Sequence, residues 1–151
     1  TTTGEDIYHK EDFIKLIDAH AVDIVHPDLA TSGGLLETKK IGDYAEENGV
    51  AMAMHFAGTP VSFMANVHCA AATQNFMALE HHSVDVDYWL DLVKTKVPMV
   101  EKGFATVPET PGLGIELNED AVKKHLDPEN QNYFGPTKEW DVDRSWDRLW
   151  S

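Results

Sequence analysis

Four polar residues whose types could do acid–base and metal chemistry recur along the chain at nearly even spacing. Glu5, Asp28, His55 and Glu80 lie 23, 27 and 25 positions apart, each at the end of a short stretch of predicted strand. This interval is near the length of one strand–helix unit in a parallel barrel of about 250 residues. Such barrels gather catalytic side chains from the C-terminal ends of several strands. The spacing therefore predicts an enzyme site that successive strands assemble.

The residue types indicate which chemistry this site could perform. A Glu at a strand end can offer the hard oxygen ligand that Mg²⁺ prefers. An Asp on a neighbouring strand can hydrogen-bond one ring nitrogen of a His, which fixes the tautomer and raises the basicity of the other nitrogen. Together these groups suit removal of a proton α to a carboxylate, because a metal ion stabilises the resulting enediolate. A structural or solvated role stays open for each residue taken alone.

The elements that must position these residues alternate between extended and helical patterns. Amphipathic spacing predicts helices over residues 10–20, 35–48 and 60–72, the last with Pro60 at its first position. Short apolar stretches predict strands at 21–25, 50–54 and 75–79, after a first strand near the N-terminus. The stretch 50–54 is apolar throughout, as expected of a parallel strand covered on both faces. Four strands with three intervening helices predict an α/β fold and half of an eight-stranded barrel.

The pattern changes after His82. Residues 84–93 are expected to form a helix with Trp89 on its apolar side, and residues 107–114 are rich in Pro and Gly. Between Thr31 and Gly34 we expect a loop and the N-cap of the following helix. The C-terminal stretch carries Trp140, Trp146 and Trp150 among charged residues. Our interpretation is that these aromatic side chains pack against another domain or subunit.

Composition excludes some classes of partner. The formal net charge of −14 argues against nucleic acid and against an anionic membrane surface, since both require clustered Lys and Arg. No apolar stretch approaches the length of a membrane span. The single cysteine, Cys69, cannot form an internal disulfide and suits a reducing, cytoplasmic compartment. We expect Cys69 to be a small buried apolar residue.

Several motifs in order resemble the enolase superfamily in its mandelate racemase/muconate lactonizing enzyme-like branch, and most nearly the acid-sugar dehydratases. The resemblance covers roughly residues 1–122. The matching motifs are 3–8 (TGEDIY), 22–28 (VDIVHPD), Gly33-Gly34, 54–60 (MHFAGTP), 75–80 (NFMALE) and 111–117 (PGLGIEL).

The resemblance implies a role for each of the four polar residues. Glu5 would be the third metal-binding carboxylate, at the end of the fifth barrel strand. Asp28 and His55 would form the Asp–His dyad on strands six and seven. Glu80, on strand eight, would hydrogen-bond the substrate carboxylate or the developing enediolate. His26 stands where Gln is more usual, which we interpret as a packing or specificity variation, with packing favoured. No role is assigned to His81 or His82.

The resemblance also implies a (β/α)7β barrel with an α+β capping domain. Residues 1–103 would be the C-terminal half of the barrel, and residues 104–151 a segment returning to the cap. The first two metal ligands and the strand-two acid/base residue would belong to an N-terminal part of the same enzyme that is missing here.

The implied activity is Mg²⁺-dependent dehydration of a sugar acid, a hydro-lyase reaction, with His55 as the base, the acid that assists hydroxyl departure, or both. Racemisation, epimerisation or cycloisomerisation of a related hydroxy acid is the alternative, because all share the enediolate. A non-catalytic fragment that needs the rest of the barrel is a third hypothesis. We expect a small-molecule acid-sugar substrate and a homo-oligomeric enzyme.

Overall fold

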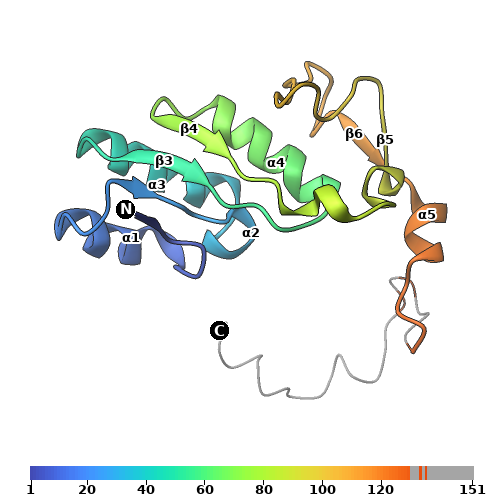
Figure 1. Ribbon diagram of the computed structural model, residues 1–151, viewed down its shortest axis with the longest axis horizontal. Helices are drawn as coiled ribbons and strands as arrows, with labels where there is room; N and C mark the ends of the chain where they lie inside the picture. Colours follow the sequence, from blue (N-terminus) through green and yellow to red (C-terminus); the bar gives the residue numbers. More distant parts are fainter. Residues whose placement is uncertain (130–132, 134, 136–151) are drawn as a thin grey trace. The chain divides into compact units, whose positions relative to one another are not determined.

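The computed structural model describes residues 1–129, 133 and 135 of the chain. It forms two compact units, one of Thr1–Asn118 and one that begins at Glu119. The first unit is built on a four-stranded parallel sheet in which spatial order follows chain order (Figure 1). Its strands are β1 (Thr2–Thr3), β2 (Ile24–Val25), β3 (Ala51–Met54) and β4 (Phe76–Leu79). Consecutive parallel strands joined by helices are the predicted half of a barrel.

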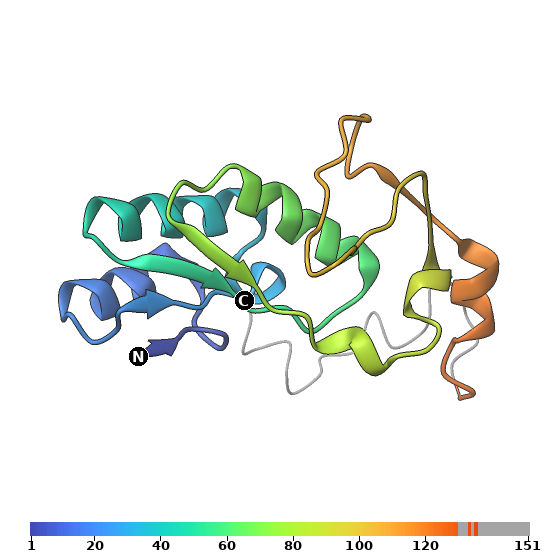
Figure 2. The same cartoon turned by 45° about the horizontal axis from the view of Figure 1, so that its top comes forward.

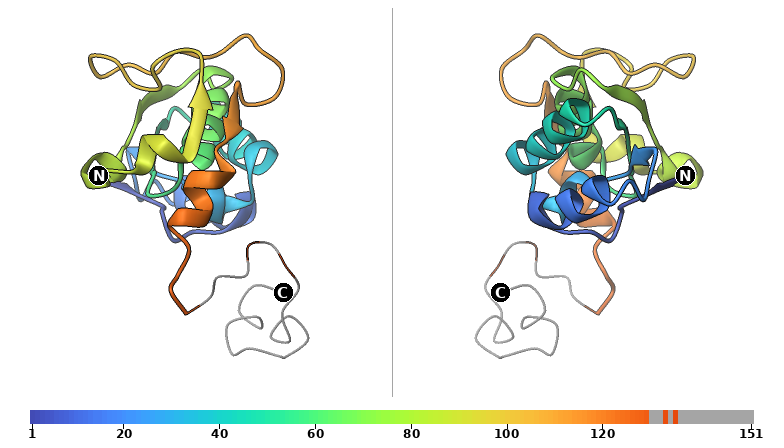
Figure 3. Two further views of the ribbon diagram at one scale, coloured as in Figure 1. Left: turned by 90° about the vertical axis from the view of Figure 1, so that its right-hand side faces the viewer. Right: turned by 90° about the vertical axis from the view of Figure 1, so that its left-hand side faces the viewer.

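Three helices connect these strands and lie along one face of the sheet (Figures 1 and 3). They are α1 (His9–Asp18), α3 (Leu35–Glu47) and α4 (Pro60–Ala71). Right-handed crossovers between neighbouring parallel strands place successive helices on the same side of a sheet. The main hydrophobic core lies between the two layers and includes Phe13, Ile17, Ile41 and Met52. The sequence prediction of these helices and strands is confirmed to within a few residues at each end.

Strand β3 has two different faces. Met52 and Met54 are fully buried, whereas Ala51 and Ala53 are half-buried. We expected both faces of this strand to be covered. Within the described residues, the expectation is confirmed for the face that carries Met52 and Met54. The other face carries the small side chains, as the crowded interior of a barrel requires.

Two local predictions were wrong. Residues 84–93 do not form one helix: they contain the end of η1 (His82–Asp85), then η2 (Trp89–Leu92) and the start of β5 (Val93–Thr95). The first half of the segment 31–34, expected to be a loop, is the end of a short helix, α2 (Leu29–Ser32), whose C-cap Gly33 is left-handed, whereas the expected N-cap of α3 is present at Gly34. Gly33 suits this position because it has no Cβ to clash at positive φ.

A second small sheet completes the first unit. Strand β5 pairs antiparallel with β6 (Ile115–Leu117), as Figure 2 shows. A second hydrophobic cluster lies between α4 and the small sheet of β5 and β6. It contains Phe56, Phe63 and Trp89, and we call it the aromatic cluster. Residues up to 118 thus belong to the first unit. The predicted division at 103/104, between the half-barrel and a segment that returns to a capping domain, stays a prediction.

The second unit contains α5 (Glu119–Lys124). The three C-terminal tryptophans lie outside the described residues, so their predicted packing is not tested. No helix in the described part of the chain is long and apolar enough to cross a membrane.

Candidate active site

The four predicted residues all follow the C-terminal ends of the strands of the parallel sheet. Main-chain hydrogen bonds continue the ladder beyond the strands and hold this edge: His26 N–H donates to Thr3 O, His55 N–H to Pro27 O and Glu80 N–H to Met54 O. These bonds are 2.9, 3.1 and 2.9 Å long. His26, His55 and Glu80 are therefore each held by the neighbouring strand that precedes them in the chain, and all four predicted residues lie at the edge of the sheet that the sequence spacing predicted.

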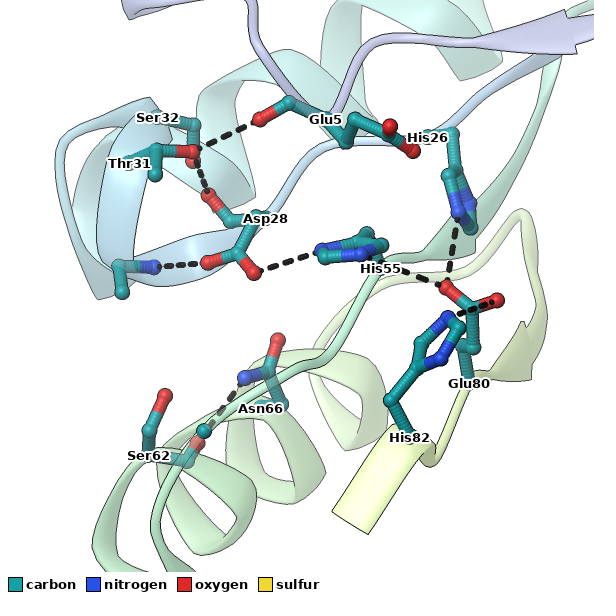
Figure 4. A network of polar contacts seen from close by, with 12 residues as sticks. Glu5, His26, Asp28, Thr31, Ser32, His55, Ser62, Asn66, Glu80 and His82 are labelled. Carbon is teal, nitrogen blue, oxygen red and sulfur yellow. Dashed lines mark hydrogen bonds and ion pairs between the residues drawn. The ribbon is translucent and has the colours of Figure 1, made fainter.

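Asp28 and His55 form a direct pair (Figure 4). His55 Nδ1 lies 2.7 Å from Asp28 Oδ2, and the two residues form an isolated parallel bridge. The second carboxylate oxygen of Asp28 accepts a 2.7 Å hydrogen bond from the backbone N–H of Ala30, so Asp28 caps helix α2. Asp28 is 7% exposed. A buried carboxylate that is held on one side fixes the proton on His55 Nδ1 and leaves Nε2 free for chemistry.

Glu80 lies next to this free nitrogen. Its Oε2 is 3.7 Å from His55 Nε2 and 3.2 Å from His26 Nε2, and its Oε1 is 2.8 Å from His82 Nε2. Burial raises the pKa of the Glu80 carboxyl, but hydrogen bonds and charge interactions with His82 and His26 outweigh it. The net pKa lies below its ordinary value. Glu80 is therefore an ionised acceptor at neutral pH.

His26 belongs to the site, although packing was the favoured prediction. Its Nδ1 lies 2.8 Å from the carbonyl oxygen of Ala53, so this nitrogen donates, and its Nε2 faces Glu80. Because both ring nitrogens are held, His26 fixes the direction of the Glu80 carboxylate. The sequence did contain a signal for this role, because His26 directly follows a predicted strand and lies two residues before Asp28.

His82 is the second residue that sequence reasoning missed. After β4 the chain stays extended at His81, so Glu80 and His82 point to one side and His81 to the other. The His81 ring packs against the aromatic cluster, with centroids 4.8 Å from Trp89 and 5.0 Å from Phe63. Burial lowers the pKa of His81, and its Nδ1 accepts from Ser83 N–H. His81 thus anchors the segment that presents Glu80 and His82.

Glu5 stands apart from this network. It is exposed, and within the described chain its carboxylate makes no hydrogen bond or ion pair. Its carbonyl oxygen accepts from Thr31 Oγ1 at 3.0 Å, which ties the loop after β1 to helix α2. The preceding Gly4 has φ +142°, and a Cβ there would lie 2.7 Å from the Phe13 ring. Glycine therefore lets β1 lead directly to Glu5.

The donor set fits Mg²⁺ only in part. Glu5 offers one accessible hard oxygen ligand, which suits Mg²⁺, but that ion requires several further oxygen atoms or waters. The single group of metal-ligating side chains that lie close together in the described residues is His55, Glu80 and His82. Two imidazoles make this group a poor magnesium site. The chain can thus supply one ligand of a Mg²⁺ site, at Glu5.

Known proteins resemble both the sequence and the fold. The family model described as enolase C-terminal domain-like matches residues 1–121. D-xylonate dehydratase of Haloferax volcanii is 42% identical over 123 residues, which are 82% of this chain and 30% of that protein. D-gluconate/D-galactonate dehydratase of Picrophilus torridus is 36% identical over 123 residues, with 80% and 31% covered. The chain thus spans about 30% of the length of these relatives.

A solved structure agrees with this assignment. A mandelate racemase/muconate lactonizing enzyme-like protein from Rubrobacter xylanophilus superposes with a TM-score of 0.82 at 39% identity. The match covers 85% of this chain and 33% of that one. The chain therefore belongs to the enolase C-terminal domain-like family, in the mandelate racemase/muconate lactonizing enzyme-like branch of the enolase superfamily.

Proposed function

We propose that this chain carries the C-terminal half-barrel of a Mg²⁺-dependent sugar-acid dehydratase. The observation that carries the proposal is the Asp28–His55 pair, whose free Nε2 faces Glu80 at the C-terminal edge of the parallel sheet. The names of the relatives support a hydro-lyase, since they are dehydratases of D-xylonate, D-gluconate and D-galactonate.

The dyad would transfer the proton. Asp28 accepts the hydrogen bond of His55 Nδ1–H and stabilises the imidazolium that forms when Nε2 takes a proton. Abstraction of the C2 proton of the acid gives an enediolate, and loss of the C3 hydroxyl as water gives the enol of a 2-keto-3-deoxy acid. His55 would serve as the base, as the acid that protonates the departing hydroxyl, or as both in turn.

Glu80 would orient the substrate. The ionised carboxylate accepts hydrogen bonds, so in this form it would bind a substrate hydroxyl. Its predicted contact with the substrate carboxylate or enediolate needs a protonated Glu80, because two oxyanions repel. His26 and His82 hold Glu80 in place for either contact.

A Mg²⁺ held partly by Glu5 would supply positive charge beside the substrate carboxylate, which lowers the cost of forming an enediolate. Glu5 lies two residues past β1, at the same edge of the sheet as the dyad. The remaining ligands would come from the part of the enzyme that the relatives have beyond the matched region. A homo-oligomeric, cytoplasmic enzyme stays a prediction.

The test is a product assay on the full-length protein with Mg²⁺ and D-xylonate, D-gluconate or D-galactonate. We expect a 2-keto-3-deoxy acid with at least one of them. The His55→Asn variant should lower kcat by about 10²–10⁴-fold, because it removes the proton-transferring nitrogen. His20→Asn, the same change at an exposed histidine far along the chain, should leave kcat unchanged.

The other hypotheses predict different products. Exchange of the C2 hydrogen with solvent deuterium, without loss of water, would assign the chain to a racemase or epimerase. Conversion to an isomer by ring formation would indicate a cycloisomerase. Full dehydration activity in His55→Asn would refute the assigned role of the dyad, and no turnover of any acid sugar would favour the non-catalytic hypothesis.

A further inference from the structure

His55, Glu80 and His82 form a compact set of ligand atoms that the proposed reaction does not use as a metal site. His82 Nε2 lies 2.8 Å from Glu80 Oε1, and His55 Nε2 lies 3.7 Å from Glu80 Oε2. All three ligand atoms lie within 4.8 Å of one another. They follow the ends of β3 and β4, and the rings of His55 and His82 both face the Glu80 carboxylate (Figure 4).

This spacing suits a tetrahedral ion. Zn²⁺ binds His nitrogen and carboxylate oxygen at about 2.0–2.2 Å, which puts neighbouring ligands of a tetrahedron roughly 3.3–3.5 Å apart. The two Glu80 contacts, which involve different carboxylate oxygens, lie on either side of that value, and all three ligand atoms lie within 4.8 Å, so side-chain rotations would bring one oxygen and both nitrogens into place. His82 is exposed and Glu80 is partly exposed, which leaves access for a water as the fourth ligand.

The ligand types select the metal. Two imidazoles and one carboxylate favour Zn²⁺ over Mg²⁺, which prefers oxygen atoms in an octahedron. Glu5, the ligand assigned to Mg²⁺, is not part of the set. The two ions would therefore use different side chains of this chain.

The contacts of His55 are those usual for a histidine that binds a metal ion. Such a histidine usually donates its other N–H to a carboxylate, which orients the ring and strengthens the ligand. Asp28 does this for His55 at 2.7 Å, and Asp28 is itself held by Ala30 N–H. On the other side, His82 N–H donates to Phe56 O at 3.2 Å, which fixes the backbone of the second imidazole.

We propose that the chain binds one Zn²⁺ through His55 Nε2, the Glu80 carboxylate and His82 Nε2. Coordination occupies the His55 nitrogen that would move the proton, so Zn²⁺ inhibits dehydration and substrate opposes the inhibition. The inhibition rests on the proposed function. The binding does not, because it needs only these three side chains.

Binding is tested by calorimetric titration of ZnCl₂ into the full-length protein, after chelator treatment and with saturating Mg²⁺. We expect one Zn²⁺ per chain that His82→Asn no longer binds. Asp28→Asn should weaken the same binding by about 10–100-fold, because it removes the carboxylate behind His55. The control is His20→Asn, an exposed position with φ +49° that Asn tolerates, and its binding should match the unchanged protein.

A spectroscopic measurement separates this site from others. Co²⁺ in place of Zn²⁺ should give the strong visible bands of tetrahedral coordination, and His82→Asn should remove them. Zinc binding that His82→Asn leaves intact, or no zinc binding at all, would overturn the proposal. Binding that His82→Asn removes, without inhibition of turnover, would support the metal site and contradict the role of His55 in proton transfer.

Discussion

At the scale of single residues, the site is one connected network. Asp28 holds His55, and Glu80 is shared between the ring nitrogens of His26 and His82. Each of these side chains restricts the orientation of the side chain that it contacts. Substitutions within the network should therefore not be additive, as expected of residues that share contacts.

Two variants of Glu80 test what its side chain does for the substrate. If it donates a hydrogen bond to the substrate carboxylate or enediolate, Glu80→Gln keeps a donor and should retain more activity than Glu80→Ala. In that case Ala lowers kcat/KM at least about 10-fold more than Gln, since one charge-assisted hydrogen bond contributes about 1.5–3 kcal/mol. Steady-state kinetics of both full-length variants measures this. Equal losses would show that Glu80 acts only as an anionic acceptor.

The thiol of Cys69 should be inert in the folded protein. It is 3% exposed, and burial raises its pKa above the ordinary value. The folded state thus favours the neutral thiol, and this contribution to stability is present at neutral pH and is lost as pH rises above about 8.5. We expect a thiol reagent at pH 8 to label Cys69 only after denaturant is added. Rapid labelling without denaturant would contradict this burial.

At the scale of elements, the parallel half-barrel was predictable and the segment after it was not. Helical periodicity and strand-length apolar stretches identified the four strands and the three long helices between them, because local pattern and burial agree there, but not the short helix α2. Residues 84–93 carry an apolar spacing that also fits a helix. Trp89 instead donates its Nε1–H to Gly58 O at 2.7 Å and packs on Phe56, and Val93 pairs with Leu117. These are tertiary contacts, which a single-sequence pattern does not contain.

The residues of the candidate site were also only partly predictable, because some of them depend on tertiary contacts. The spacing of strand ends identified Asp28, His55 and Glu80, which the structure brings together. His26 and His82 were missed, because only the ladder and the aromatic cluster show that their rings face Glu80. Glu5 was placed at the correct edge but not within the network.

Packing of α3 on the sheet depends on Gly42. A Cβ there would lie 2.6 Å from Thr73 Cγ2 and 3.3 Å from Met52 Sδ. In a helix, alanine is favoured over glycine by about 0.5–1 kcal/mol, but overpacking a core costs about 1–3 kcal/mol. Gly42→Ala should therefore lower the free energy of unfolding by about 1 kcal/mol. Denaturant unfolding measures it, with Glu46→Ala on the exposed side of the helix as control. A stabilised Gly42→Ala would refute the close contact.

At the scale of the whole molecule, the described sheet would supply one side of the proposed active site. The ends of its four strands carry the Asp28–His55 dyad, Glu80 and Glu5, the proposed ligand for Mg²⁺, and the chain spans about 30% of its relatives' length. The proposed reaction therefore needs the full-length protein. The central claim of this proposal is that His55, oriented by Asp28, is the group that moves a proton in the reaction.

The most direct test is the turnover of a sugar acid by full-length Asp28→Asn, measured with C2-protonated and C2-deuterated substrate. We predict that kcat falls by about 10²–10⁴-fold with little change in KM, and that deuterium slows the variant. Asp87→Asn, at an exposed position, should behave as the unchanged protein. An Asp28→Asn enzyme with unchanged kcat would contradict the account, because the dyad would then not be the group that moves the proton.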